Sequence, residues 1–122
     1  MNERQYAIAT VEQTLDASAA LRAHLRMTER VGKRMISALR AEVPVSKAVE
    51  AAGASAARLR QDSKDVFAAY EHSRHVMRAA FILSSVAEGM SISDIGRALG
   101  VSRQMASRLV REARDGTADG AG

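Results

Sequence analysis

The segment Ser91–Arg114 constrains the fold of this chain more than any other part of it. Its sequence, SISDIGRALGVSRQMASRLVREAR, places apolar residues at helical spacing on both sides of Gly100. Glycine accepts the left-handed backbone conformation that commonly ends a helix. Ser91 and Ser102 stand where two helices would begin, and serine is a preferred N-cap residue. The segment therefore predicts two short helices joined by a tight turn.

The same segment meets the packing demands of a helix-turn-helix. Asp94 follows Ser91 at the spacing of a capping box, and Gly96 is the small residue required where the two helices cross. We expect the following side chains to face a core: Ile92, Ile95, Leu99, Val101, Met105, Ala106, Leu109 and Val110. The remaining outer face of the second helix is polar and basic.

The composition favours helix along the rest of the chain. With 122 residues, the chain can form one compact domain or two very small ones. Hydrophobic residues make up 47% but aromatic residues only 3%, so the core must consist of Ala, Leu, Val, Ile and Met. A single proline and many alanines favour helix over sheet. We expect an all-α protein of six or seven helices.

Several helix boundaries are expected before the helix-turn-helix. The periodicity predicts a first helix in residues 1–18, whose apolar residues Ile8, Val11 and Leu15 offer a dimerisation seam. A second helix follows, and its pattern leaves open a break near Thr28. Further boundaries are a turn at Gly53, a connecting helix over 63–72 and a disordered tail over 116–122; residues 62–65 leave open whether the run to His75 is one helix or two.

An internal repeat links the two halves of the chain. A shift of 47 residues places Val45–Ser55 over Ile92–Ser102, with Ser, Ala, Gly and Ser matching at four positions. This predicts two tandem three-helix units, over 19–62 and 73–115; the alternative is chance similarity between two Ala-rich segments. The repeat over 19–62 is the degenerate unit, because Val49 stands where a small residue is needed and Asp62 stands where Leu109 packs in the other repeat.

Residues 73–115, and above all Ala98–Gln104 (ALGVSRQ), resemble the helix-turn-helix of bacterial and phage transcription regulators, including the sigma region-four and resolvase-like types. The resemblance covers about a third of the chain, and Ala106 departs from it because a β-branched residue is more usual there. It implies a sequence-specific regulator of transcription, a repressor, that binds double-stranded DNA. The expected DNA-binding residues are Ser93, Arg97, Ser102, Arg103, Gln104, Ser107, Arg108 and Arg111. Arg103 and Gln104 are expected to contact bases.

The basic residues suggest a secondary DNA-binding set. The net charge is +4, and 15 of the 18 basic residues are arginine, which suits bidentate contacts with phosphate and guanine. The secondary candidates are Arg26, Arg30 and Lys33 on one predicted helix and Arg58, Arg60 and Gln61 in the degenerate unit. Alternatively, the arginines reflect the coding bias of a GC-rich genome, these faces are simply solvated, and the degenerate unit serves packing or dimerisation.

Two partner arrangements follow from the weak binding of a single helix-turn-helix. We expect either a homodimer or the use of both tandem units in one chain. The alternative function is a protein-interaction module, such as an RNA polymerase-binding adaptor or an antirepressor that docks on a partner regulator.

The sequence offers little for other classes of function. His72 and His75 have a spacing that could seat a metal, but without further ligands nearby, packing or exposed histidines are favoured. There is no cysteine, phosphate-binding glycine loop or nucleophile motif. We expect no enzyme activity, no cofactor and no metal. No apolar run is long enough to span a membrane and the N-terminus lacks a signal-peptide pattern, so we expect a cytoplasmic, nucleoid-associated protein.

Overall fold

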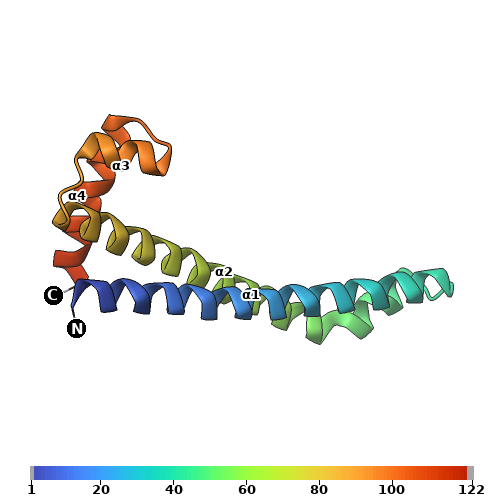
Figure 1. Cartoon of the computed structure of the whole chain (residues 1–122). Helices are drawn as coiled ribbons and strands as arrows, with labels where there is room; N and C mark the ends of the chain where they lie inside the picture. Colours follow the sequence, from blue (N-terminus) through green and yellow to red (C-terminus); the bar gives the residue numbers. More distant parts are fainter. Residues whose placement is uncertain (1, 121–122) are drawn as a thin grey trace. The chain divides into compact units, whose positions relative to one another are not determined.

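The structure is a computed structural model that describes residues 2–120, and side chains as far as Gly116. Within these residues it is all-helical and contains no strand (Figure 1). The helices are α1 (Glu3–Arg40), α2 (Val45–Ala87), α3 (Ile92–Leu99) and α4 (Arg103–Gly120). The all-α class is confirmed, but the expectation of six or seven helices is wrong, because the described residues form four.

The interruptions expected in the first half of the chain are absent. Thr28 lies inside α1, where its hydroxyl donates to the carbonyl of His24 at 3.1 Å and leaves the helix intact. Gly53 and residues 62–65 lie inside α2. Glycine in a helix costs only about 1 kcal/mol relative to alanine, so it does not break a helix that is packed along its length. The segment 19–62 therefore forms no helix-turn-helix, and residues 63–72 are simply part of α2.

The C-terminal end of the chain is also more helical than expected. α4 continues to Gly120, so residues 116–120 are helical rather than disordered. Residues 121–122, the end of the expected disordered tail, lie outside the described residues.

The chain divides into two compact units. The first unit contains α1 as far as Thr14, α2 from His72, and all of α3 and α4. The second unit is Leu15–Glu71, the remainder of α1 and α2 with their connection. These divisions cut both long helices and differ from the boundaries expected from the repeat.

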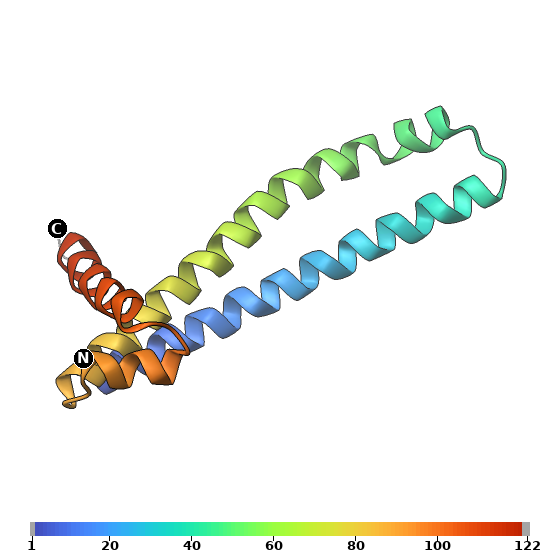
Figure 2. The same cartoon turned by 90° about the horizontal axis from the view of Figure 1, so that it is seen from above.

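The second unit is an antiparallel helical hairpin (Figure 2). Buried and half-buried side chains recur at spacings of three and four, as in a coiled-coil seam, and on α1 the repeat also passes through Thr28, which is exposed. On α1 these inner-seam residues are Ala17, Leu21, His24, Val31, Met35 and Ala38; on α2 they include Ala48, Ala52, Ala56, Leu59, Ser63, Val66 and Tyr70.

A polar pair fixes how the two helices of the hairpin align. His24 is buried, and its Nε2 lies 2.6 Å from the hydroxyl of Ser63. The ring of Phe67 meets the His24 ring edge-on, with 6.4 Å between centroids. Because a one-turn slip would leave His24 buried without a partner, this pair selects one register of the seam.

The connection of the hairpin is tight. At the end of α1 the N–H of Val43 donates to the carbonyl of Ala38 at 3.0 Å, and that of Glu42 donates to Leu39 at 3.1 Å. This pair of bonds is the Schellman motif, and it places Glu42 at a φ of 64°. The Pro44 carbonyl then accepts from the N–H of Ala48 at 3.0 Å, which begins α2.

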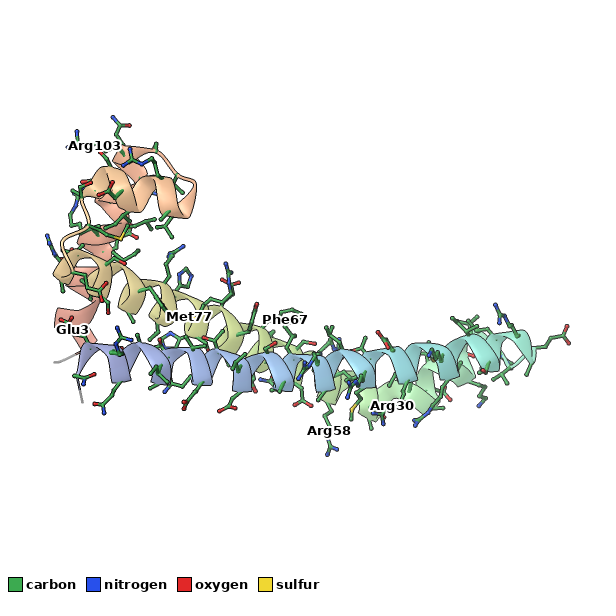
Figure 3. The ribbon with its side chains drawn as sticks, in the orientation of Figure 1. Glu3, Arg30, Arg58, Phe67, Met77 and Arg103 are labelled. Atoms are coloured by element: carbon green, nitrogen blue, oxygen red, sulfur yellow. The ribbon has the colours of Figure 1, made fainter. Side chains whose placement is uncertain are left out.

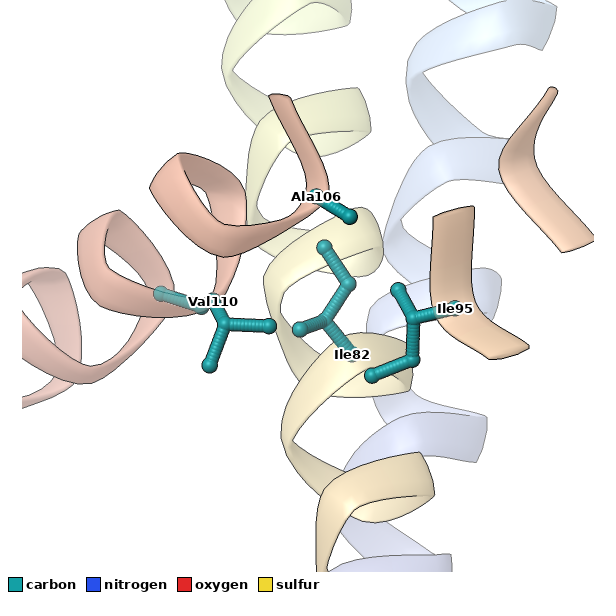
Figure 4. Packing of buried hydrophobic residues seen from close by; sticks show 5 residues of the cluster. Ile82, Ile95, Ala106 and Val110 are labelled. Atoms are coloured by element: carbon teal, nitrogen blue, oxygen red, sulfur yellow. The ribbon is translucent and has the colours of Figure 1, made fainter. Parts of the chain in front are cut away.

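The first unit has its core where three helical segments meet. Ile82 comes from the end of α2, Ile95 from α3, and Ala106, Val110 and Ala113 from α4 (Figure 4). α2 thus contributes a supporting helix to α3 and α4, and this core determines where the outer face of α4 can lie.

Candidate nucleic-acid interface

The start of α3 is fixed by a reciprocal pair of hydrogen bonds. The hydroxyl of Ser91 accepts from the N–H of Asp94 at 3.1 Å, and the Asp94 carboxylate accepts from the N–H of Ser91 at 3.2 Å. The capping box expected from the sequence is confirmed. Two backbone donors that a helix would otherwise leave unsatisfied are thereby paired.

The turn between α3 and α4 depends on Gly100. Its φ of 72° and ψ of 31° are left-handed, as predicted. The N–H of Val101 donates to the carbonyl of Gly96 at 2.9 Å, which closes α3. Directly afterwards, the hydroxyl of Ser102 accepts from the N–H of Met105 at 3.1 Å and caps α4. These short-range bonds set the direction in which α4 leaves the turn.

The crossing of α3 and α4 is close. A Cβ on Gly96 would lie 3.1 Å from the carbonyl oxygen of Val101 and 3.5 Å from the Cβ of Ala106. Ala106 is itself fully buried, with 0% of its surface exposed. The absence of a β-branched residue at position 106 therefore has a physical reason, since extra methyl groups there would meet this close contact.

Most of the predicted core side chains lie as expected. Ile95, Ala106 and Val110 are buried, and half-buried side chains pack against them, namely Ile92, Val101 and Leu109. Leu99 is a wrong prediction, because it is 42% exposed. It lies in the last turn of α3, where the chain leaves the core toward Gly100. Met105 is half-buried outside the core cluster, and its sulfur lies 2.9 Å from a guanidinium nitrogen of Arg108.

The outer face of α4 carries most of the predicted DNA-binding residues. Arg103, Gln104, Arg108 and Arg111 are exposed, and Ser107 is half-buried. At about 100° per residue they occupy an arc of roughly 140°. Figure 3 labels Arg103 at the beginning of α4. Ser102 is exposed at the N-cap, directly before the first turn of α4.

Arg114 belongs to the same face and was not among the predicted site residues. It is exposed and lies on α4 three residues after Arg111, within the same arc. The three-and-four spacing of Arg103, Ser107, Arg111 and Arg114 was the signal in the sequence that could have identified it.

The arginines of this region differ in their existing partners. The Nε of Arg108 lies 3.7 Å from a carboxylate oxygen of Glu112, and Arg97 pairs with Asp94 on α3. Both pairs are exposed, and such pairs stabilise a protein by about 0–1 kcal/mol, so a phosphate can replace the carboxylate. Among the described side chains, Arg103, Gln104 and Arg111 form no hydrogen bond or ion pair.

The ionisation of Asp94 is perturbed by its hydrogen bonds. Hydrogen bonds from the hydroxyl and the backbone N–H of Ser91, and from Arg97, hold the pKa of the Asp94 carboxyl below its ordinary value of 3.8. Asp94 therefore stays ionised and keeps Arg97 occupied. Ser93, next to it on α3, is half-buried.

The predicted secondary DNA-binding residues are all exposed, but they do not form one surface. Arg26, Arg30, Lys33, Arg58, Arg60 and Gln61 belong to the second unit. Arg58 and Arg60 lie roughly 200° apart around α2, so they point to opposite sides of the hairpin. Figure 3 labels Arg30 and Arg58. The degenerate unit thus provides no second outer face comparable to that of α4.

Metal-ligating side chains do not gather in the described part of the chain. No group of three or more His, Cys, Asp and Glu side chains there is arranged to hold a metal ion. The ring Nδ1 of His75 lies 3.2 Å from a guanidinium nitrogen of Arg78. None of the helices in the described range is both long and apolar enough to cross a membrane.

Comparisons with protein families, with curated proteins and with solved structures find no match to this chain. The resemblance to helix-turn-helix regulators therefore stays a prediction that rests on the residues themselves.

Proposed function

We propose that this chain is a sequence-specific regulator of transcription, a repressor, that binds double-stranded DNA through α4. The observation that carries the proposal is the outer face of α4, on which exposed arginines and Gln104 project from a helix held by a capped turn and a buried core. Binding groups on a rigid element need little ordering when they meet a ligand.

α4 has the dimensions and the side chains for the major groove. The groove is about 12 Å wide and admits an α-helix. Arg103 and Gln104 lie in the first turn of α4, where a recognition helix contacts base edges. Arginine pairs with the O6 and N7 acceptors of guanine, and glutamine pairs with adenine.

The remaining residues of the face suit the phosphate backbone. Ser102, Ser107, Arg108 and Arg111 set the register of the helix on the duplex, and Arg114 extends their row. Arg108 exchanges its exposed pair with Glu112 for a phosphate. Arg97 and Ser93 on α3 take a smaller part, because Arg97 is already paired with Asp94.

The second candidate is a protein-interaction module, an RNA polymerase-binding adaptor or an antirepressor. Its specific support is a group of aliphatic side chains that the second unit leaves in solvent, among them Leu25 and Ile36. The face of α4 fits this candidate poorly, because the cores of protein interfaces are depleted in charged residues.

A selection experiment tests the proposal. The full chain is used to enrich duplexes from a randomised double-stranded DNA pool, and binding to the enriched duplex is measured by fluorescence anisotropy. Arg103→Ala should lose about 1–3 kcal/mol of discrimination at one base pair. Arg111→Ala should weaken binding to all duplexes alike. It should also lower by about one the salt slope, which is the steepness with which the logarithm of the binding constant falls with the logarithm of the salt concentration.

Arg4→Ala is the matched control, because Arg4 is an exposed arginine of α1 outside the candidate interface. Its affinity and salt slope should equal those of the parent. The proposal fails if no sequence is enriched and the two α4 variants bind DNA as the parent does.

A further inference from the structure

A second repeat runs along α1 in the hairpin, shifted by one residue from the inner seam. We name it the outer stripe: Leu15, Ser18, Arg22, Leu25, Glu29, Gly32, Ile36 and Leu39. It keeps the alternating three-and-four spacing over this whole length. Its four large aliphatic side chains are exposed, Leu15 by 64%, Leu25 by 44%, Ile36 by 49% and Leu39 by 43%.

The outer stripe is more aliphatic than a solvated helix face needs to be. The inner seam, which is already covered, contains small or polar residues such as Ala17, His24 and Ala38. Leucine and isoleucine that recur at positions of a three-and-four repeat form the pattern that packs against another helix. Four large aliphatic side chains that share one exposed helix face in this way are therefore candidates for packing against another helix.

α2 widens the same side of the hairpin. In an antiparallel pair of helices, positions one residue past the seam on each helix lie on the same side. On α2 these positions are occupied by exposed residues, of which Val49 and Phe67 are large and apolar, 55% and 48% exposed, and Arg60, Lys64 and Glu71 are charged. A face about 37 Å long and two helices wide offers roughly 750 Å², close to the ~800 Å² per partner of a stable interface.

The charges of the outer stripe indicate what covers it. Arg22 and Glu29 are its only charged residues. A parallel copy would place each of them opposite itself and bring like charges together, which destabilises a seam. An antiparallel copy reverses the order, so that Arg22 of one copy lies about one turn from Glu29 of the other.

The sizes of the side chains agree with this antiparallel register. In this register Leu15 of one copy lies opposite Leu39 of the other. Two leucines therefore meet at each end of the outer stripe. Ser18 lies opposite Ile36, which places a small side chain against a large one. Such pairing of small and large residues lets facing helices fill the space between them.

Gly32 makes room for the charged residues of the stripe. In the same register it lies opposite Arg22, and a Cβ at Gly32 would meet nothing within 4 Å. The arginine stem can therefore pass over the glycine, and its guanidinium can continue to the carboxylate of Glu29. Both charges are then paired across the two copies.

We infer that a second copy of this chain packs antiparallel on the outer stripe and that the protein forms a two-fold symmetric dimer. This inference does not depend on DNA binding by α4. If both hold, a dimer presents two copies of α4, and the preferred DNA site is a palindrome.

Light scattering coupled to size exclusion tests whether a second copy of the chain packs on the outer stripe. At about 50 µM the parent chain should have the mass of a dimer. Leu25→Lys combined with Ile36→Lys should be monomeric at that concentration. Circular dichroism should show unchanged helix content, because both side chains are already exposed and the inner seam is untouched.

A charge exchange tests the antiparallel order. Arg22→Glu and Glu29→Arg, each alone, should raise the dissociation constant of the dimer at least about tenfold, because each creates two like-charge pairs. The double exchange should restore it. Arg26→Glu is the matched control, since Arg26 is exposed and belongs to neither the inner seam nor the outer stripe.

Three results would overturn the inference. The first is a monomeric parent chain, and the second is a Leu25 and Ile36 double variant that remains dimeric. The third is a double charge exchange whose dimer dissociates more readily than that of either single variant. The first two exclude a second copy on the outer stripe, and the third excludes the antiparallel order.

Discussion

Ser91 and Asp94 show how two side chains can define the beginning of a helix, here α3. Each accepts a hydrogen bond from the backbone N–H of the other residue, and Arg97 adds a further bond to the carboxylate. These contacts favour the ionised form of Asp94, which lowers its pKa. The stability of α3 is therefore coupled to pH through this residue.

Asp94→Asn should be less stable than the parent at neutral pH, and the difference should shrink in acid. Because the pKa of Asp94 is lower in the folded than in the unfolded state, its contribution is fully present above the ordinary value of 3.8 and is lost as the pH falls through the lowered value. Urea unfolding of both proteins across this range measures the difference. A difference that is constant with pH would contradict the role of the carboxylate.

A methyl group added at Gly96 should destabilise the protein. Gly96→Ala places a Cβ 3.1 Å from the carbonyl oxygen of Val101, so the turn or α4 must shift, at an expected cost of about 1–3 kcal/mol. Chemical denaturation measures this loss. Gly116→Ala is the control in the same unit, because its Cβ would meet nothing within 4 Å, and it should not destabilise the protein.

For single residues, the sequence predicted the caps and the turn of α3 and α4 correctly, because these signals are local. The serine caps, the capping-box spacing and the turn glycine each act within a few residues. Leu99 was placed in the core wrongly, since periodicity alone does not show that a helix end turns away from the core.

At the scale of elements, α1 and α2 are longer than any helix predicted from the sequence. Their interruptions were expected at residues that weaken helices locally, such as Thr28 and Gly53. The continuous inner seam outweighs these weak preferences, because tertiary packing rather than propensity stabilises most helices. The alternating spacing from Ala17 to Ala38 was visible in the sequence and would have predicted the hairpin.

A substitution at Gly53 tests whether α2 is continuous there or is interrupted by a turn. Gly53→Ala should stabilise the protein by about 0.5–1 kcal/mol, because the position is helical and a Cβ there would meet nothing within 4 Å. Thermal unfolding of the variant and the parent measures this gain. A loss of stability would instead indicate a left-handed turn at Gly53, as the internal repeat predicted.

For the whole molecule, the repeat of 47 residues does not correspond to a repeat of structure. Leu83 and Val86 pack against the core of the first unit, whereas their matches Ile36 and Leu39 are exposed in the second. The two units therefore suit different tasks. We expect the first to present α4 to DNA and the second to offer the outer stripe to another copy.

The most direct test of DNA recognition by α4 is the affinity of the full chain for an enriched duplex, compared with a scrambled duplex of the same composition. We expect tighter binding to the enriched duplex by about 10³-fold or more at physiological salt, and we expect Arg103→Ala to remove much of this preference. Equal affinity of the parent for both duplexes, falling alike as salt rises, would contradict sequence recognition by α4.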